Sequence, residues 1–111
     1  MNYVLDSHTH TLASGHAYAT LHEMAKAAAD KGLELLGVTE HAMAMPGTCH
    51  EYYFMNMRIL PREMYGIEVM HGAEVNIMDY HGSLDMEEYL LKKMDVAIAS
   101  LHTPCIKPGS K

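Results

Sequence analysis

Nine histidines occur among the 111 residues of this chain, and two of them stand in a spacing suited to metal binding. His8 and His10 are separated by one residue in Asp6-Ser7-His8-Thr9-His10. In an extended backbone, residues two apart point to the same side, so both imidazoles can face one ion. Neutral imidazole is the commonest transition-metal ligand near pH 7. The pair therefore indicates metal binding as the first chemical hypothesis.

Further ligand-type side chains come at the ends of three later apolar segments. They lie in Thr39-Glu40-His41, Gly72-Ala73-Glu74 and Ser100-Leu101-His102. A carboxylate such as Glu74 can bridge two ions, which then lie about 3.5–4 Å apart, the separation used to activate water for an in-line displacement. His16, six residues beyond His10, stands on a loop that could fold back over this group. A lone histidine of this kind is usually structural, and it is the joint pattern that predicts a metal site.

The elements that must position these residues are four short apolar runs. We predict strands at Tyr3–Leu5, Leu33–Thr39, Glu68–Val75 and Asp95–Leu101. The runs mostly lack polar alternation, which is typical of parallel strands buried on both faces. The carboxyl ends of parallel strands share one edge, where active sites of α/β folds lie. We therefore expect the candidate ligands to converge in space.

Helices are predicted between the strands. Thr20-Leu21-His22-Glu23 is a capping-box sequence for a helix that stops at Gly32, and Asp85-Met86-Glu87-Glu88 is a second one, for a helix to about Lys93. The segment 51–65 is expected to be helical until Pro61 interrupts it, and residues 79–82 to form a turn. This order predicts a parallel βα series, either a self-contained four-stranded sheet or part of a barrel.

The remaining polar residues near the predicted edge receive secondary roles. Asp6 is expected to accept a hydrogen bond from an imidazole and fix its tautomer. His71 precedes Glu74 on the same strand and would either reach the pocket or support it. His22 and His81 are expected to be a solvated helix residue and a turn residue. His50 stands beside Cys49, but no second Cys/His pair completes a zinc site.

Composition excludes several other classes of protein. The net charge is −6 and the eight Lys and Arg residues are scattered, which argues against nucleic-acid binding. The longest apolar runs are far too short to span a membrane, and no secretory signal is visible. Two cysteines are too few for a disulfide framework, so a cytoplasmic location is expected.

The ordered set of motifs resembles the PHP family, named for polymerase and histidinol phosphatase domains, and looks most like its short, stand-alone bacterial phosphatases. The matching text is Asp6-Ser7-His8-Thr9-His10, His16-Ala17-Tyr18, Thr39-Glu40-His41, Glu74-Val75-Asn76-Ile77 and Ser100-Leu101-His102. The resemblance implies an α/β fold, a distorted barrel of seven parallel βα strands, of which this chain would be the N-terminal portion with about four βα units. It also implies up to three divalent ions, zinc with manganese or iron as alternatives.

By the same resemblance, each ion has expected ligands. His8 and His10 would bind the first ion, Glu74 would bridge to the second, and His102 would join it there. His16 and His41 would hold the third ion. Water activated by the metal would attack phosphorus, with no separate protein base, and the ions would neutralise charge on the phosphoryl oxygens.

The family pattern continues with another His and an Asp-x-His pair beyond residue 111. Residues 1–111 are therefore expected to be a single partial PHP domain, truncated after the fourth strand, with open sheet edges that favour self-association. The first ion would then be the best populated.

The leading function is hydrolysis of a small phosphorylated metabolite by the complete protein. The alternatives are a non-catalytic metal-binding fragment or accessory domain, and an amidohydrolase-type deaminase, which His16 and Thr39-Glu40-His41 fit poorly.

Overall fold

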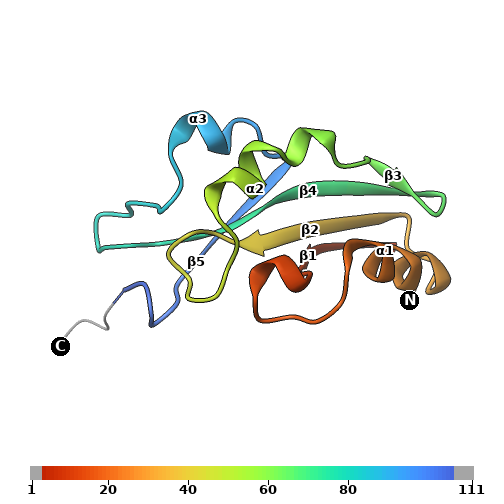
Figure 1. The fold of residues 1–111 in the computed structure, drawn as a ribbon, viewed down its shortest axis with the longest axis horizontal. Coiled ribbons are helices and arrows are strands. Elements are labelled where there is room, and N and C mark those ends of the chain that lie inside the picture. The colour runs from red at the N-terminus through yellow and green to blue at the C-terminus, as the bar shows by residue number, and fades with distance from the viewer. Residues whose placement is uncertain (1–3, 107–111) are drawn as a thin grey trace.

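The computed structural model describes residues 4–106. Four strands carry the architecture, β1 (Leu5–Thr9), β2 (Leu35–His41), β4 (Ile67–Asn76) and β5 (Val96–Ser100), as Figure 1 shows. The remaining elements are η1 (Leu12–Ser14), α1 (Leu21–Asp30), α2 (Glu51–Met55), η2 (Met57–Ile59), β3 (Glu63–Met64) and α3 (Glu88–Leu91). No helix in this part of the chain is both long and apolar enough to cross a membrane.

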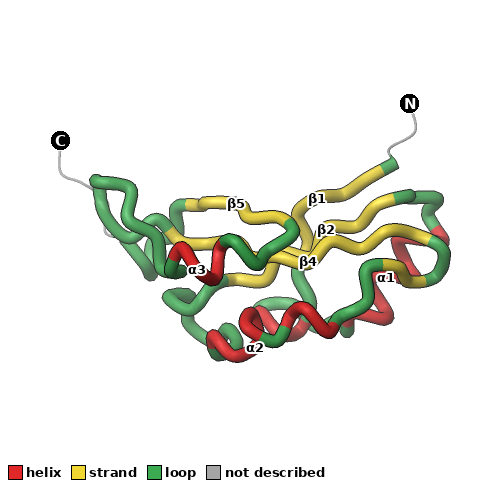
Figure 2. Tube along the Cα trace, turned by 90° about the horizontal axis from the view of Figure 1, so that it is seen from above, coloured by secondary structure: helices red, strands yellow, loops and turns green. Residues whose placement is uncertain are grey.

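The four longer strands form one parallel sheet. β1 pairs with β2, β2 with β4, and β4 with β5, in each case parallel. The sheet curls into a half-barrel with α1 and α2 on the same side of the strands (Figure 2). The predicted α/β class and the N-terminal portion of a parallel (βα) barrel are therefore confirmed.

The short strand β3 was not predicted, and it makes the sheet mixed. It pairs antiparallel with the start of β4 through Glu63–Glu68 and Met64–Ile67. The connection between them is the tight turn Tyr65-Gly66, where both residues have positive φ angles, 52° and 82°. Glycine adopts such angles without strain, and tyrosine does so less readily. Nothing but Gly66 marks this hairpin in the sequence.

The outer face of the sheet, on which the helices pack, holds the apolar core. One cluster joins α1 to the first halves of β2 and β4 through Ala25, Ala28, Leu36, Val38 and Val69. The second joins α2 and α3 to the second half of β4 through Phe54, Leu90, Ala73 and Val75. Burial of these side chains is the main force that holds the helices on the strands.

The opposite, inner face carries a glycine on each central strand. A Cβ at Gly37 would lie 2.8 Å from the carbonyl oxygen of Ser7 in β1, and a Cβ at Gly72 would overlap that of Val96 in β5. The two edge strands, β1 and β5, therefore lie closer to positions 37 and 72 than a side chain at these positions would permit. A larger side chain at either position would push the edge strand away, so the two glycines permit the close packing of β1 and β5 in the curled sheet (Figure 2).

Strand boundaries and burial depart from the sequence prediction at the two outer strands. β1 runs from Leu5 to Thr9 rather than ending at Leu5, so His8 lies within it; Tyr3 lies outside the described residues. Its first four residues are exposed, and β5 alternates between half-buried and exposed residues. The prediction of burial on both faces is therefore wrong for these strands, because each has only one strand neighbour along most of its length in residues 4–106.

Only one of the two predicted capping boxes forms. Thr20 and Glu23 exchange reciprocal side-chain to backbone hydrogen bonds at the start of α1. The prediction at Asp85 is wrong: α3 begins at Glu88, and its N-cap residue Glu87 makes no capping hydrogen bond. The Asp85 carboxylate is instead bonded to Asn76 and to the amide of Ala44. Tertiary contacts have taken the acceptor that a cap would need.

The remaining local predictions are confirmed. The helical segment after Glu51 gives way to the 3-10 turn η2 and stops before Pro61. Residues 79–82 form a turn, in which the amide of Gly82 donates to the carbonyl of Asp79 at 3.2 Å.

Candidate metal centre

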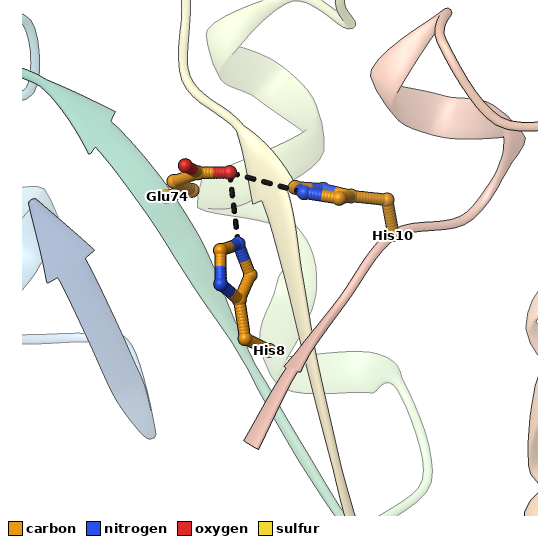
Figure 3. Close-up of side chains that lie close together, drawn as sticks. All are labelled: His8, His10 and Glu74. Atoms are coloured by element: carbon orange, nitrogen blue, oxygen red, sulfur yellow. Dashed lines mark hydrogen bonds and ion pairs between the residues drawn. The ribbon is translucent and has the colours of Figure 1, made fainter. Parts of the chain in front are cut away.

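The site is built around the carboxylate of Glu74, which lies near the end of β4 and is only 4% exposed. The Nε2 atoms of His8 and His10 each lie 3.0 Å from its Oε1 atom, as Figure 3 shows. His8 belongs to β1 and His10 directly follows that strand. The inner face of the sheet thus brings three side chains, separated by up to 66 residues in sequence, into contact.

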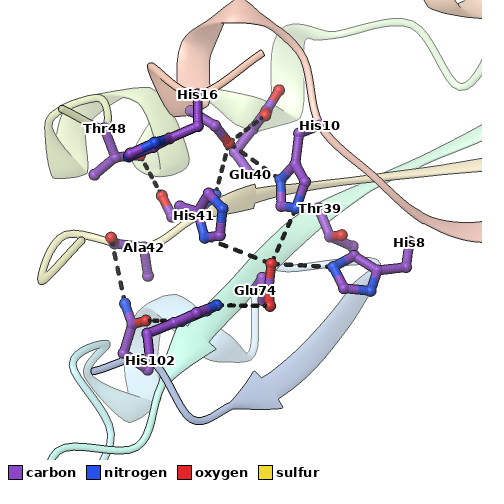
Figure 4. Close-up of polar contacts among 12 residues, drawn as sticks. His8, His10, His16, Thr39, Glu40, His41, Ala42, Thr48, Glu74 and His102 are labelled. Atoms are coloured by element: carbon purple, nitrogen blue, oxygen red, sulfur yellow. Dashed lines mark hydrogen bonds and ion pairs between the residues drawn. The ribbon is translucent and has the colours of Figure 1, made fainter. Parts of the chain in front are cut away.

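Two further imidazoles approach the same carboxylate from the other side (Figure 4). His102 Nε2 lies 3.3 Å from Oε2, and His41 Nδ1 lies 3.5 Å from Oε1. His41 is the last residue of β2, and His102 comes two residues after β5. The predicted convergence of His8, His41, Glu74 and His102 at the carboxyl ends of the strands is therefore present.

The ligand atoms fall into two sets that share Glu74. One set is His8, His10 and Glu74, and the other is His41, Glu74 and His102. Within each set the candidate ligand atoms all lie within 4.8 Å of one another. Each set offers two imidazoles and a carboxylate oxygen, which is a ligand combination found at catalytic zinc sites.

Burial and charge keep this cluster in the protonation states that metal binding requires. Burial would raise the pKa of Glu74, but hydrogen bonds from Ser100 and His8 outweigh it, and the pKa is lowered. Burial lowers the pKa of His10 and of His41, against the opposing attraction of Glu74. Near neutral pH the carboxylate is ionised and both imidazoles are neutral.

The residues present fit a bound cation. His41 Nδ1 is buried and has no hydrogen-bond partner in the described part of the chain, although it faces the Glu74 carboxylate. A buried polar atom without a partner is costly. A divalent ion among these imidazoles and the carboxylate would supply the missing interaction.

His16 departs from its expected pairing with His41. Its Nε2 atom lies 2.6 Å from the carbonyl oxygen of Pro46, and its ring centre is 5.6 Å from that of His41 in an edge-on arrangement. The structure groups His41 with Glu74 and His102 instead. A role of His16 in metal binding stays a prediction.

The two residues expected to support the ligands do something else. The Asp6 carboxylate accepts a hydrogen bond from the backbone amide of His8 at 3.2 Å and not from an imidazole. His71 is fully buried on the outer face, because it stands an odd number of residues from Glu74, and its Nε2 atom lies 2.8 Å from the carbonyl oxygen of Pro61. Neither residue therefore contacts an imidazole of the site in this structure.

Sequence reasoning missed the residues that do support the imidazoles. His102 Nδ1 lies 2.6 Å from Asn76 Oδ1, and His10 Nδ1 lies 3.2 Å from Ser14 Oγ. Behind them stand the carboxylates of Asp85 and Glu40. Asn76 had two signals: it belongs to the motif Glu74-Val75-Asn76-Ile77 that resembles the family, and it stands two residues after Glu74, which places it on the same face of β4.

Comparison with known proteins agrees with this geometry. The model of the PHP domain matches residues 6–108. The chain belongs to the PHP domain family. The matched range includes every candidate ligand, from the His-x-His motif at residues 8–10 to His102.

Several curated relatives of this PHP domain are named "probable phosphatase". The chain is 56% identical over 110 residues to one from Clostridium novyi and 52% identical over 109 residues to one from a Thermoanaerobacter species. It is 48% identical over 108 residues to one from Acetivibrio thermocellus. These matches cover 97–99% of this chain and 44–45% of the relatives, so the chain spans about half the length of the relatives it matches.

Proposed function

We propose that the complete protein is a metal-dependent phosphatase that hydrolyses a small phosphorylated metabolite. The observation that carries this proposal is the set of four imidazole nitrogens within 3.0–3.5 Å of the buried carboxylate of Glu74. The family and the names of the relatives support phosphoester hydrolysis over other metal-dependent reactions.

The proposed ligand sets follow the contacts around Glu74. His8, His10 and Glu74 would hold one divalent ion, and His41, Glu74 and His102 a second. The third ion that the family resemblance implies would involve His16. Zinc suits a site of imidazole and carboxylate, and manganese or iron are alternatives.

The chain's own residues would prepare this site for a phosphate ester. Divalent ions bound here would activate water and neutralise charge on the phosphoryl oxygens. Glu74 holds both sets together, and burial keeps His10 and His41 neutral so that their lone pairs are free to bind. Within residues 4–106, the polar side chains that contact Glu74 are four imidazoles and the Ser100 hydroxyl, so bound cations would supply the positive counter-charge for a phosphate.

The test is release of phosphate from p-nitrophenyl phosphate by the full-length protein supplied with zinc or manganese. His8→Ala is expected to abolish metal-dependent turnover because it removes a ligand. His22→Ala, on the exposed surface of α1, is the matched control and is expected to retain it. Equal metal-dependent rates for the wild type and His8→Ala would refute the assigned role.

The same assay separates the alternatives. Tight metal binding without turnover by the full-length protein would favour a non-catalytic metal-binding domain. Release of ammonia or an amine in place of phosphate would favour the deaminase. We also propose a cytosolic location, which the two free cysteines, Cys49 and Cys105, support.

A further inference from the structure

Two hydrogen-bonded chains of side chains lead away from the imidazoles of His102 and His10, on the side opposite Glu74. In both rings Nε2 faces Glu74, and Nδ1 faces a neutral side chain, Asn76 or Ser14. Each chain ends at a carboxylate, that of Asp85 or Glu40. A ring nitrogen's protonation is set by the hydrogen bond made at the other nitrogen, so these contacts determine what Nε2 offers to the site.

The orientation of the Asn76 amide is fixed by its surroundings. Asn76 is fully buried, and its Nδ2 atom lies 2.7 Å from Asp85 Oδ2 and 3.5 Å from the carbonyl oxygen of Ala42. Both of these atoms only accept hydrogen bonds, so the amide nitrogen must face them and Oδ1 must face His102. Because an amide oxygen also only accepts, the proton of the ring lies on His102 Nδ1.

Asp85 is itself held firmly enough to act as the anchor. Its Oδ1 atom accepts from the backbone amide of Asn76 at 2.8 Å, and its Oδ2 atom accepts from the backbone amide of Ala44 at 2.8 Å. These contacts tie the carboxylate to β4 and to the loop after β2. The Asn76 side chain therefore cannot turn over without losing its bond to a fixed acceptor.

Ser14 plays the corresponding part for His10. Its buried hydroxyl accepts from the backbone amide of His41 at 2.8 Å and donates to Glu40 Oε1 at 2.8 Å. A serine hydroxyl has a single proton, and here it is donated in the hydrogen bond to the Glu40 carboxylate. The remaining contact, with His10 Nδ1 at 3.2 Å, must then be donated by the ring.

We infer that Asn76 and Ser14 are positioning residues that fix His102 and His10 as their Nδ1–H tautomers, so that an unprotonated Nε2 of each ring faces Glu74. An unprotonated Nε2 atom cannot donate a hydrogen bond to Glu74, but it can bind a cation together with that carboxylate. The role of these tautomers in metal binding therefore rests on the proposed function. His8 is the contrast: its one side-chain hydrogen bond within the described residues is to Glu74, and its Nε2 atom is free to donate there.

Long-range ¹H–¹⁵N NMR spectra of the imidazoles test the tautomers directly in the metal-free 111-residue chain, at about pH 8, which is above the ordinary imidazole pKa of about 6.5. His102 and His10 are expected to carry their proton on Nδ1, whereas His8 and the exposed His22 carry it on Nε2. An Nε2–H form of His102 or His10 in the wild-type chain would overturn the inference. This measurement needs no variant and no catalytic activity.

Variants then test the positioning role. Asn76→Ala is expected to convert His102 to its Nε2–H form and leave His10 unchanged, and Ser14→Ala is expected to do the reverse, with the backbone amide spectrum as the check of folding. Zinc affinity, measured by competition with a chelator, should fall about 10- to 100-fold in either variant. A folded variant with unchanged tautomers and affinity would overturn the role.

The tautomer result and the proposed function fail separately. Nδ1–H tautomers and zinc binding without phosphatase activity of the full-length protein would refute the function alone and uphold the inference.

Discussion

The two faces of strands β2 and β4 differ in composition and in work. On the outer face, Leu36, Val38, Val69 and Val75 pack under the helices and are at most 1% exposed. On the inner face, the same strands present glycines at positions 37 and 72 and the ligand-type residues of the site. Residues adjacent in sequence therefore belong to different environments, since strand side chains alternate.

This difference separates stability from chemistry. Apolar burial on the outer face stabilises the sheet, whereas the inner face gathers a buried carboxylate and four imidazoles that could share cations. A substitution on the outer face should therefore destabilise the fold without removing the metal ligands. A substitution of a ligand on the inner face should weaken metal binding in a chain that stays folded.

The largest expected effect is on the inner face, at the residue shared by both ligand sets. Glu74→Gln should abolish measurable zinc binding, because it removes the negative charge and replaces one oxygen of the shared carboxylate by an amide nitrogen that cannot bind a metal. This loss should exceed the about 10- to 100-fold effect of a supporting residue. The free energy of unfolding of the metal-free chain should fall only slightly, because the contacts that lower the pKa of the Glu74 carboxyl are weakened. Calorimetric titration with zinc and denaturant unfolding measure the two quantities.

Glu68→Gln provides the matched control for this substitution. Glu68 lies on the same strand, an even number of residues away, and is exposed at the opposite end. It should leave zinc binding unchanged. Zinc binding by Glu74→Gln equal to that of the control would contradict the central place of Glu74.

A truncation on the outer face should show the opposite signature. Leu36→Ala removes a side chain that is 1% exposed between β2 and α1, and it should lower the free energy of unfolding by about 2–5 kcal/mol. The number of zinc ions bound at saturation under folding conditions should not change. Leu12→Ala, at a side chain that is 54% exposed, should cost far less. Denaturant unfolding decides the first point, and an equal cost in both variants would contradict it.

A smaller effect is expected where the inner face controls curvature. Gly72→Ala places a Cβ against the carbonyl of Val96, so β5 must move away from β4. Overpacking of this kind costs about 1–3 kcal/mol. Zinc affinity should fall as well, because β5 carries His102 toward Glu74.

The control for curvature adds bulk to the same pair of strands without a clash. Ala97→Val enlarges an exposed residue of β5 and should change stability by about 0.5 kcal/mol or less. Full zinc affinity in Gly72→Ala would show that the approach of β5 is not set by this glycine.

The smallest effect is a dependence of stability on pH that involves both faces. Burial lowers the pKa of His10 and His41 on the inner face and of His71 on the outer face below the ordinary value of 6.5. Acidification below about 6.5 therefore protonates these groups first in the unfolded chain. Because the unfolded state then binds more protons, the free energy of unfolding of the metal-free chain should fall as the pH decreases from about 7 to 5.

His71→Gln separates the contributions of the two faces. The glutamine amide can still donate to the carbonyl of Pro61 but does not titrate. The variant should lose part of the decline in stability, whereas His22→Gln on exposed α1 should not. Unfolding curves at several pH values measure this, and an unchanged decline in His71→Gln would exclude the outer-face contribution.

The order of elements and the meeting of ligands were predictable because they follow from local rules. The capping box at Thr20 forms from residues three apart, and parallel strands bring their ends together whatever their exact bounds. His8, His41, Glu74 and His102 were therefore placed correctly on one edge from their positions after apolar runs.

The supporting contacts were not predictable, because they depend on which of several donors, some far away in sequence, lies within hydrogen-bond distance of each carboxylate in the folded chain. Asp85 has the sequence of a helix cap, yet it bonds to Asn76 and to the amide of Ala44, which lies 41 residues earlier. Asp6 stands two residues before His8, as an imidazole partner would, but a backbone amide lies within its reach. Local spacing does not reveal such competition.

The glycines at positions 37 and 72 have a consequence for any attempt to redesign the molecule. Glycine is the only amino acid without a Cβ, so neither position has a conservative replacement, unlike the aliphatic residues across the sheet, which exchange for one another at modest cost. A change in the spacing between the ligands on the inner face would therefore require β1 or β5 to move as a whole. Saturation mutagenesis should accordingly find these two sites intolerant even though glycine offers no side-chain group that could bind a ligand.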